Sequence, residues 1–121
     1  ERGGTWDKGK GCDTFGPLGP WLVTVDEVGD IGNLEMWLEV DGKRYQHGST
    51  RTMIFGIAKI VSYVSGFMSL QPGDVITTGT PPGNGLAQTP PVFLKPGNVM
   101  HLHVGKLGEQ RQMVVSPVEH A

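Results

Sequence analysis

Glycine and proline limit what this chain can fold into more than any other feature of its sequence. Of its 121 residues, 19 are Gly and nine are Pro. Both residue types disfavour helix interiors and favour turns, so the long helices of a bundle are not expected. The composition instead predicts short elements joined by tight turns. We therefore expect a fold of the α+β class that is mainly β.

The clearest strand signal lies in residues 34–40, where apolar and polar side chains alternate. Apolar residues stand at positions 34, 36, 38 and 40, and Glu35, Trp37 and Glu39 stand between them. This is the period of a strand with one buried face. Asp41-Gly42 can supply the two positive φ angles of a type I′ turn, so residues 43–47 are expected to return as the partner strand.

Four more strands are predicted where β-favouring residues follow a proline or a turn, at 21–25, 74–79, 98–104 and 110–115. Two of them follow similar turns, Pro72-Gly73 and Pro96-Gly97. Proline fixes the first central φ of a type II turn and glycine permits the second. A further turn is expected near Gly108.

One helix is predicted over residues 51–65, because apolar residues recur there at helical spacing. Ser49 or Thr50 is the expected N-cap, and Gly66 lies just past the end. We expect its apolar stripe to pack on the sheet. The predicted architecture is a mixed, mostly antiparallel β-fold with one packed helix, in a single domain over residues 1–121.

The charge balance is close to neutral, with 10 basic and 12 acidic residues. There is no run of Lys or Arg, so nucleic acid is not an expected partner. No apolar stretch approaches the roughly 20 residues that cross a bilayer, so a membrane is not expected either. The single Cys12 cannot form an internal disulfide, which favours a cytoplasmic protein.

Two loops could carry chemistry. Lys10 lies between Gly9 and Gly11, where the backbone can approach a ligand and the ammonium can neutralise a carboxylate or phosphate. The alternative is a solvated lysine in a flexible loop. Thr80 follows Gly79 at the end of a predicted strand, where its hydroxyl and backbone N–H can contact a ligand. The alternative is an ordinary strand cap.

His101 and His103 are two residues apart on a predicted strand and share one face. That spacing can bind a metal ion, but two ligands without a third do not form a site, and a surface pair is the favoured interpretation. Cys12 has no His or Asp partner nearby in sequence, and a small buried thiol is favoured over a nucleophile.

Taken together, the two loops and their surroundings resemble the fumarylacetoacetate hydrolase family over essentially the whole chain. The similarity is to the bacterial branch of ureidoglycolate lyases and diketo-deoxy-sugar-acid hydrolases. The stretches that carry it are Gly9–Phe15, Pro17–Thr24, Ser49–Phe55, Leu70–Pro82 and Phe93–Gly97.

The resemblance implies an enzyme that uses Mg²⁺ or Mn²⁺ on a small 2-oxo or 1,3-diketo acid, for C–C bond hydrolysis or related lyase chemistry in catabolism. It implies that Lys10 lies beside the metal and the substrate oxygens as a catalytic residue, and that Thr14 is close to the metal. Thr80, with Gly79, matches the residues that contact the substrate carboxylate. A homodimer is also implied.

The chain departs from the family pattern at the metal ligands. The family uses a Glu-x-Glu pair and an Asp, and this sequence contains no Glu-x-Glu. We therefore expect the C-terminal portion of a larger catalytic domain, inactive alone and without a tightly bound metal. The alternative is a non-catalytic module that binds small acids or dimerises.

Overall fold

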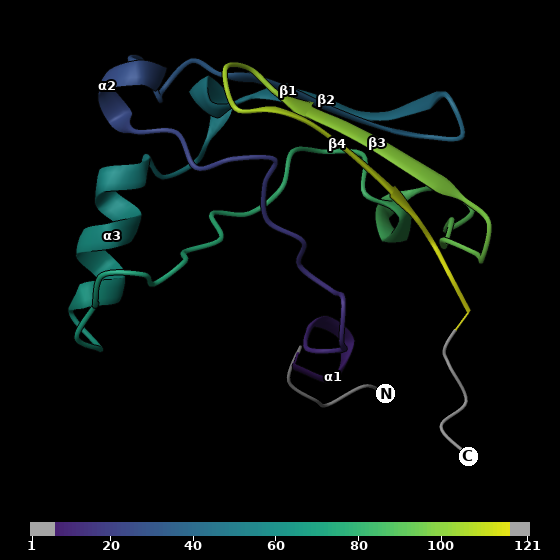
Figure 1. The fold of residues 1–121 in the computed structure, drawn as a ribbon, viewed down its shortest axis with the longest axis horizontal. Coiled ribbons are helices and arrows are strands. Elements are labelled where there is room, and N and C mark those ends of the chain that lie inside the picture. The colour runs from purple at the N-terminus through teal and green to yellow at the C-terminus, as the bar shows by residue number, and fades with distance from the viewer. Residues whose placement is uncertain (1–6, 117–121) are drawn as a thin grey trace.

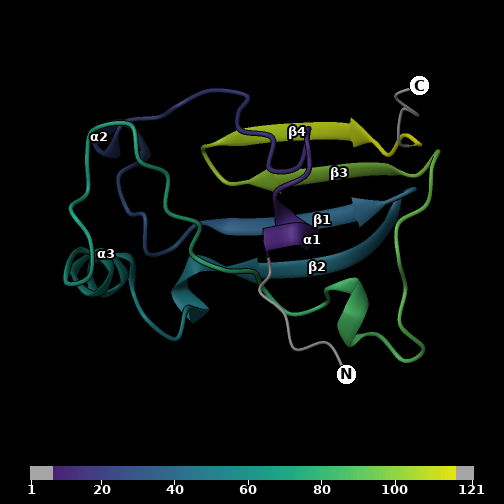
Figure 2. The same cartoon turned by 90° about the horizontal axis from the view of Figure 1, so that it is seen from below.

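The computed structural model describes residues 7–116, and a four-stranded antiparallel sheet forms its centre. The strand order is β2-β1-β3-β4 (Figure 2). The strands are β1 (Glu35–Val40), β2 (Lys43–Ser49), β3 (Val99–Val104) and β4 (Gly108–Met113). With few helices beside this sheet, the fold is α+β and mainly β, as predicted.

The hairpin between β1 and β2 has the predicted turn. Asp41 has φ 51° and Gly42 has φ 78°, the two positive angles that a type I′ turn requires. The Asp41 carboxylate also accepts hydrogen bonds from the Val99 backbone N–H at 2.8 Å and from the Asn98 side chain at 2.7 Å. The turn is thereby fastened to the start of β3.

Both Pro-Gly turns are confirmed. Gly73 has φ 101° and Gly97 has φ 92°. In each turn the residue after glycine donates its N–H to the carbonyl three positions earlier, at 3.1 Å in the first turn and 3.0 Å in the second. Its side chain accepts in return from the first residue's N–H, at 2.7 Å in both turns. The sequence similarity of the two segments is therefore a structural repeat of the turn alone.

The two faces of the sheet differ in polarity. Leu38 pairs with Leu102 at the centre of one face, and the neighbouring cross-strand pairs there are also apolar. Trp37 lies on the other face with His101 and His103. Figures 1 and 2 place α1 (Asp7–Lys10) and the long segment between α3 (Ile57–Ser65) and β3 on the same side of the sheet. The apolar face is therefore the one that the loops approach.

Two predicted strands do not form. Residues 21–24 lie outside any strand, and α2 (Val25–Val28) begins where that strand was expected to end. Residues 74–79 also lie outside any strand. β-Favouring residues make a strand only when a neighbouring strand supplies ladder hydrogen bonds, and neither segment pairs with the sheet. The strand predicted at 110–115 is present but begins two residues earlier, at Gly108.

The predicted helix begins six residues later than expected. Ser49 caps only a 3₁₀ turn, η1 (Thr50–Thr52), by accepting a hydrogen bond from the Arg51 N–H at 3.2 Å. Met53 then adopts an extended conformation, and α3 starts after Gly56. Its end at Ser65, before Gly66, agrees with the prediction. A second 3₁₀ turn, η2 (Gly85–Ala87), lies between α3 and β3.

The position of α3 differs from the expected packing. It stands beside the end of the sheet and not over its face (Figures 1 and 2). Val61, in the predicted apolar stripe, is 39% exposed. Among the described residues, the buried apolar side chains are Val28 and Leu34, at 3% and 7% exposed. The apolar residues of α3 and of the sheet therefore retain surface that water can reach.

Thr50 links the 3₁₀ turn η1 to the segment before β1, and this link supports a prediction. Its Oγ1 accepts from the Leu34 N–H at 2.8 Å and donates to the Ile31 carbonyl at 2.9 Å, both partly buried. Replacing Thr50 by valine keeps the shape but leaves both backbone groups unsatisfied. We expect the free energy of unfolding to fall by about 1–3 kcal/mol. Thr50→Ser retains the hydroxyl and should lose less in the same denaturant titration; equal stability of all three proteins would contradict this account.

Candidate functional site

The loop of residues 79–83 is held against β2 by one side chain. The Gln46 amide nitrogen donates to Thr80 Oγ1 at 2.8 Å and to the Pro81 carbonyl oxygen at 2.7 Å. Gln46 is half-buried and Thr80 is exposed. Thr80 is therefore open to solvent, and the hydrogen bond from the Gln46 amide holds its hydroxyl oxygen in place.

Glycines allow the backbones of the loop and β2 to meet. A Cβ on Gly83, which has φ 105°, would lie 2.0 Å from the Tyr45 carbonyl oxygen. A Cβ on Gly48 would lie 2.8 Å from the Cβ of Pro81. Gly79 has φ 107°, an angle that other residues rarely adopt, with open space around it. The position of Thr80 thus depends on small residues on both sides of the contact.

A β-bulge turns Gln46 toward this loop. Leu38 pairs with Gln46 and the next residue, Glu39, pairs with Arg44, so Tyr45 is the extra residue of the bulge. Strict alternation would put Arg44 and Gln46 on the same face. The bulge separates them, because Arg44 binds Glu39 on the polar face while Gln46 reaches Thr80 on the apolar one. The sequence analysis did not identify Gln46, because its face depends on the bulge.

Lys10 and Thr14 lie in the first described segment. Lys10 ends α1 and is exposed. Thr14 has φ 66° and lies in a turn closed by the Phe15 N–H and the Cys12 carbonyl at 3.0 Å. Cys12 is exposed, so the prediction that it is buried is wrong. α1, which ends at Lys10, and the segment between α3 and η2, which contains Thr80, lie on the same side of the sheet (Figure 1).

A cavity of about 520 Å³ lies between residues 17–23 and the apolar face of the sheet. Its lining is mostly apolar and includes Trp21, Leu22, Met100, Leu102 and Val104. Gly108 permits this approach, since a Cβ there would lie 2.9 Å from both Pro20 and Trp21. The Gln110 side-chain amide donates to the Gly19 carbonyl and fastens the segment to β4. The predicted strand at 21–25 is thus replaced by a segment that packs on the sheet through side chains.

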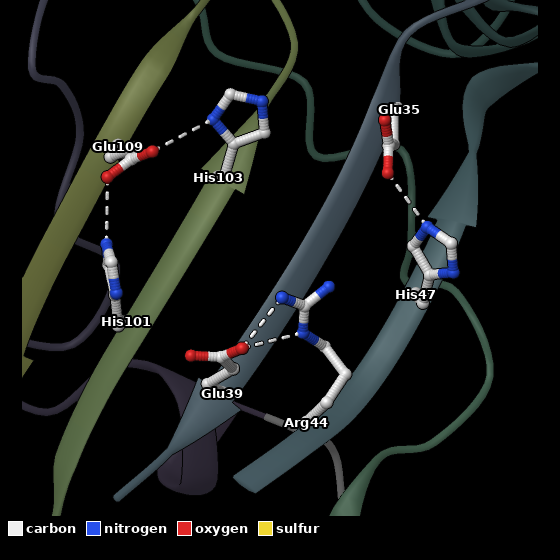
Figure 3. Close-up of polar contacts among 7 residues, drawn as sticks. All are labelled: Glu35, Glu39, Arg44, His47, His101, His103 and Glu109. Atoms are coloured by element: carbon white, nitrogen blue, oxygen red, sulfur yellow. Dashed lines mark hydrogen bonds and ion pairs between the residues drawn. The ribbon is translucent and has the colours of Figure 1, made fainter. Parts of the chain in front are cut away.

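Several side chains on the polar face of the sheet are paired with one another (Figure 3). His101 Nε2 lies 2.9 Å from one Glu109 carboxylate oxygen, and His103 Nδ1 lies 3.6 Å from the other. The Trp37 ring contacts both imidazoles, edge-on to His101 at 4.9 Å and stacked with His103 at 5.5 Å. The two histidines share one face, as predicted.

The remaining pairs on this face complete the pattern. Arg44 donates twice to one Glu39 oxygen, at 2.9 Å and 2.7 Å, and its guanidinium lies 4.3 Å above the Trp37 ring. Glu35 and His47 lie 2.9 Å apart across β1 and β2 (Figure 3). In residues 7–116, no group of three or more His, Cys, Asp or Glu side chains is arranged to hold a metal ion. The polar face is a set of side chains paired with one another, whereas Gln46 and Thr80 meet on the apolar side.

The sequence matches the family profile described as the C-terminal region of fumarylacetoacetate (FAA) hydrolase over residues 1–115. This match covers nearly the whole chain, including the loops of Lys10 and Thr80.

The chain belongs to the fumarylacetoacetate hydrolase family.

Individual members of the fumarylacetoacetate hydrolase family agree with this assignment. A curated Burkholderia ambifaria protein, named as a hydrolase, is 66% identical over 113 residues, which are 93% of this chain and 40% of that protein. The fumarylacetoacetate hydrolase of Exiguobacterium antarcticum is 37% identical with a TM-score of 0.80, covering 84% of this chain and 36% of that one. This chain therefore spans about 40% of the length of its curated relatives.

A second solved structure is a complex with a metal ion. It is the maleylpyruvate hydrolase of Sphingobium sp. SYK-6 in complex with manganese(II) and pyruvate, 37% identical with a TM-score of 0.73, covering 82% of this chain and 35% of that chain. The described residues of our chain do not supply a ligand set for such an ion. Among residues 7–116, no helix is long and apolar enough to cross a membrane.

Proposed function

We propose that the full-length protein is a divalent-metal-dependent hydrolase or lyase of small 2-oxo or 1,3-diketo acids, and that this chain binds the substrate carboxylate. The observation that carries the proposal is the Thr80 hydroxyl, which is exposed at a loop fixed by Gln46. The resemblance to the family implies that this threonine contacts the substrate. A positioned hydroxyl can donate a hydrogen bond to a carboxylate oxygen, and charge strengthens that bond.

Metal binding is assigned to residues other than those described here. A family neighbour is described with manganese(II) and pyruvate, which supports Mg²⁺ or Mn²⁺ as the ion of the full-length protein. The described residues offer no cluster of metal ligands. Thr14 is proposed to lie near the ion, as the resemblance implies.

Lys10 is proposed as the catalytic residue of this chain. Its ammonium would stabilise the negative charge that develops on the substrate's 2-oxo oxygen, while Thr80 and the Gly79–Thr80 backbone hold the carboxylate. A fixed positive charge lowers the barrier when it acts more strongly on the transition state than on the ground state. The homodimer, the cytoplasmic location and the branch within the family stay predictions.

Turnover by the full-length protein tests the proposal. We would supply maleylpyruvate or fumarylpyruvate with Mn²⁺ or Mg²⁺ and measure the release of pyruvate, expecting metal-dependent release that chelation abolishes. Binding of pyruvate without turnover of either compound would favour the non-catalytic small-acid module. If pyruvate does not bind and neither compound is turned over, both functions are contradicted.

Thr80 itself supports a second prediction. Thr80→Val keeps the branched shape but removes the hydroxyl, so the substrate carboxylate loses a donor. We expect kcat/KM for the better of the two acylpyruvates, maleylpyruvate or fumarylpyruvate, to fall by about 10–100-fold, mainly through a higher KM. Thr80→Ser retains the hydroxyl and should stay close to the wild-type value. Unchanged kinetics in Thr80→Val would remove Thr80 from the substrate-binding residues.

A further inference from the structure

We infer that Gln46 is a positioning residue that directs the hydroxyl proton of Thr80 toward the ligand. The inference rests on the proposed function, since it takes Thr80 as a contact of the substrate carboxylate. Three features carry it: the orientation of the Gln46 amide, the hydrogen-bonding capacity of Thr80 Oγ1, and the rigid contact between β2 and the loop.

The Pro81 carbonyl fixes which end of the Gln46 amide faces the loop. A backbone carbonyl oxygen can only accept a hydrogen bond, so the side-chain atom 2.7 Å from it must be the amide nitrogen. An amide with its oxygen at that place would put two acceptors in contact. The same nitrogen carries a second proton, and Thr80 Oγ1 lies 2.8 Å from it. Gln46 therefore donates to Thr80 and cannot accept from it through this atom.

The direction of that hydrogen bond determines what the Thr80 hydroxyl has left to offer. Its oxygen accepts from Gln46, so its own proton must go elsewhere. Without a ligand the hydroxyl donates to the Pro81 carbonyl oxygen at 3.4 Å, a long hydrogen bond to an acceptor that it shares with the Gln46 amide at 2.7 Å. A carboxylate oxygen arriving from solvent is a stronger acceptor. The arrangement thus prepares the hydroxyl as a donor to an anion.

The frame around this pair restricts how far Thr80 can move. Gly83 lies on the Tyr45 carbonyl, and Gly48 lies under Pro81 with no room for a side chain on either. The bulge at Tyr45 aims Gln46 at the loop. Backbone contacts therefore fix the distance between the loop and β2. The Gln46 amide fixes the Thr80 rotamer and the direction of its hydroxyl proton.

Kinetics and binding in the full-length protein test the inference. Gln46→Leu removes both donors, and Gln46→Glu keeps the shape without the N–H groups in case the leucine variant does not fold. We expect KM for the acylpyruvate and the inhibition constant of pyruvate each to rise by about tenfold, with kcat changed by less than about threefold. Gln112→Leu is the matched control, because Gln112 is also a half-buried strand glutamine, and its amide donates to Gln110 at 2.6 Å.

A double-mutant cycle separates positioning from a general structural role. In the Thr80→Val background, Gln46→Leu should cost little more, since the hydroxyl that it positions is gone. Fully additive losses, or a KM in both Gln46 variants equal to wild type, would overturn the inference. Rescue also distinguishes the roles: in Thr80→Ser, which restores the hydroxyl, the Gln46→Leu effect should return.

A readout without substrate keeps this inference separate from the proposed function. In protein labelled at threonine methyl groups, the Thr80 methyl should show one ordered rotamer in wild type and averaging in Gln46→Leu. If wild type neither binds pyruvate nor turns over acylpyruvates, the proposed function fails while the ordering of Thr80 by Gln46 still stands or falls on this signal. An unchanged methyl signal in Gln46→Leu overturns the positioning role.

Discussion

Replacing Lys10 by alanine is expected to lower kcat of the full-length protein by about 10²–10³-fold while leaving its unfolding midpoint unchanged. The reason is electrostatic, since the ammonium is proposed to stabilise charge on the substrate oxygen in the transition state. Lys10 is exposed at the end of the one-turn helix α1, so its removal leaves no cavity in the described part of the chain. Metal-dependent release of pyruvate under saturating substrate measures the effect.

Two further variants show whether the effect belongs to this lysine. Lys59→Ala removes the same charge from the exposed surface of α3 and should retain wild-type kcat. Lys10→Arg keeps the charge but changes the geometry, because a planar guanidinium does not replace a compact ammonium. We expect it to recover only part of the loss. If Lys10→Ala and Lys59→Ala behave alike, Lys10 has no catalytic role.

Gly83→Ala is expected to be strongly destabilising and to displace the Thr80 loop. The new Cβ would lie 2.0 Å from the Tyr45 carbonyl oxygen and 3.0 Å from its carbon, and neither backbone atom can rotate away. The residue also has φ 105°, which strains any side chain. We expect the free energy of unfolding of the full-length protein to fall by about 3 kcal/mol or more.

Gly73→Ala is the control that separates the collision from the strain. Gly73 has φ 101°, close to that of Gly83, but a Cβ there meets no atom within 4 Å. Strain alone should cost about 1–2 kcal/mol. Denaturant titrations of the two variants give the difference. Equal losses would mean that the loop moves away from β2 at little cost, and the contact at Tyr45 would then not fix Thr80.

The predictions from sequence succeeded where neighbouring residues determine the backbone. Asp41-Gly42 and the two Pro-Gly pairs adopt the positive φ angles that their turns require, because those angles depend on one or two residues. The alternation in residues 34–40 and the pair of histidines on β3 gave the correct strands and faces. Gly66 marked the end of α3 correctly.

The predictions failed where a distant part of the chain decides. Residues 21–25 and 74–79 have β-favouring composition, but neither segment pairs with a strand of the sheet. Where the helix was expected to begin, residues 50–52 form a 3₁₀ turn, Thr50 is hydrogen-bonded to Leu34 and Ile31, and Met53 is extended. Local sequence patterns give only a preference for helix or strand. Long-range hydrogen bonds then decide which of several conformations of similar energy forms.

The same division applies to the candidate site. The sequence by itself determined the family, and through it the proposed roles of Lys10, Thr14, Gly79 and Thr80. It also determined the turns and the alternating strands. Only the tertiary structure brought Gln46 to Thr80, 34 residues away, by inserting a bulge at Tyr45 and bringing Gly83 against β2. The face to which a strand residue points depends on the pairing of the whole strand, and a one-residue bulge reverses it, so no local pattern could have revealed this contact.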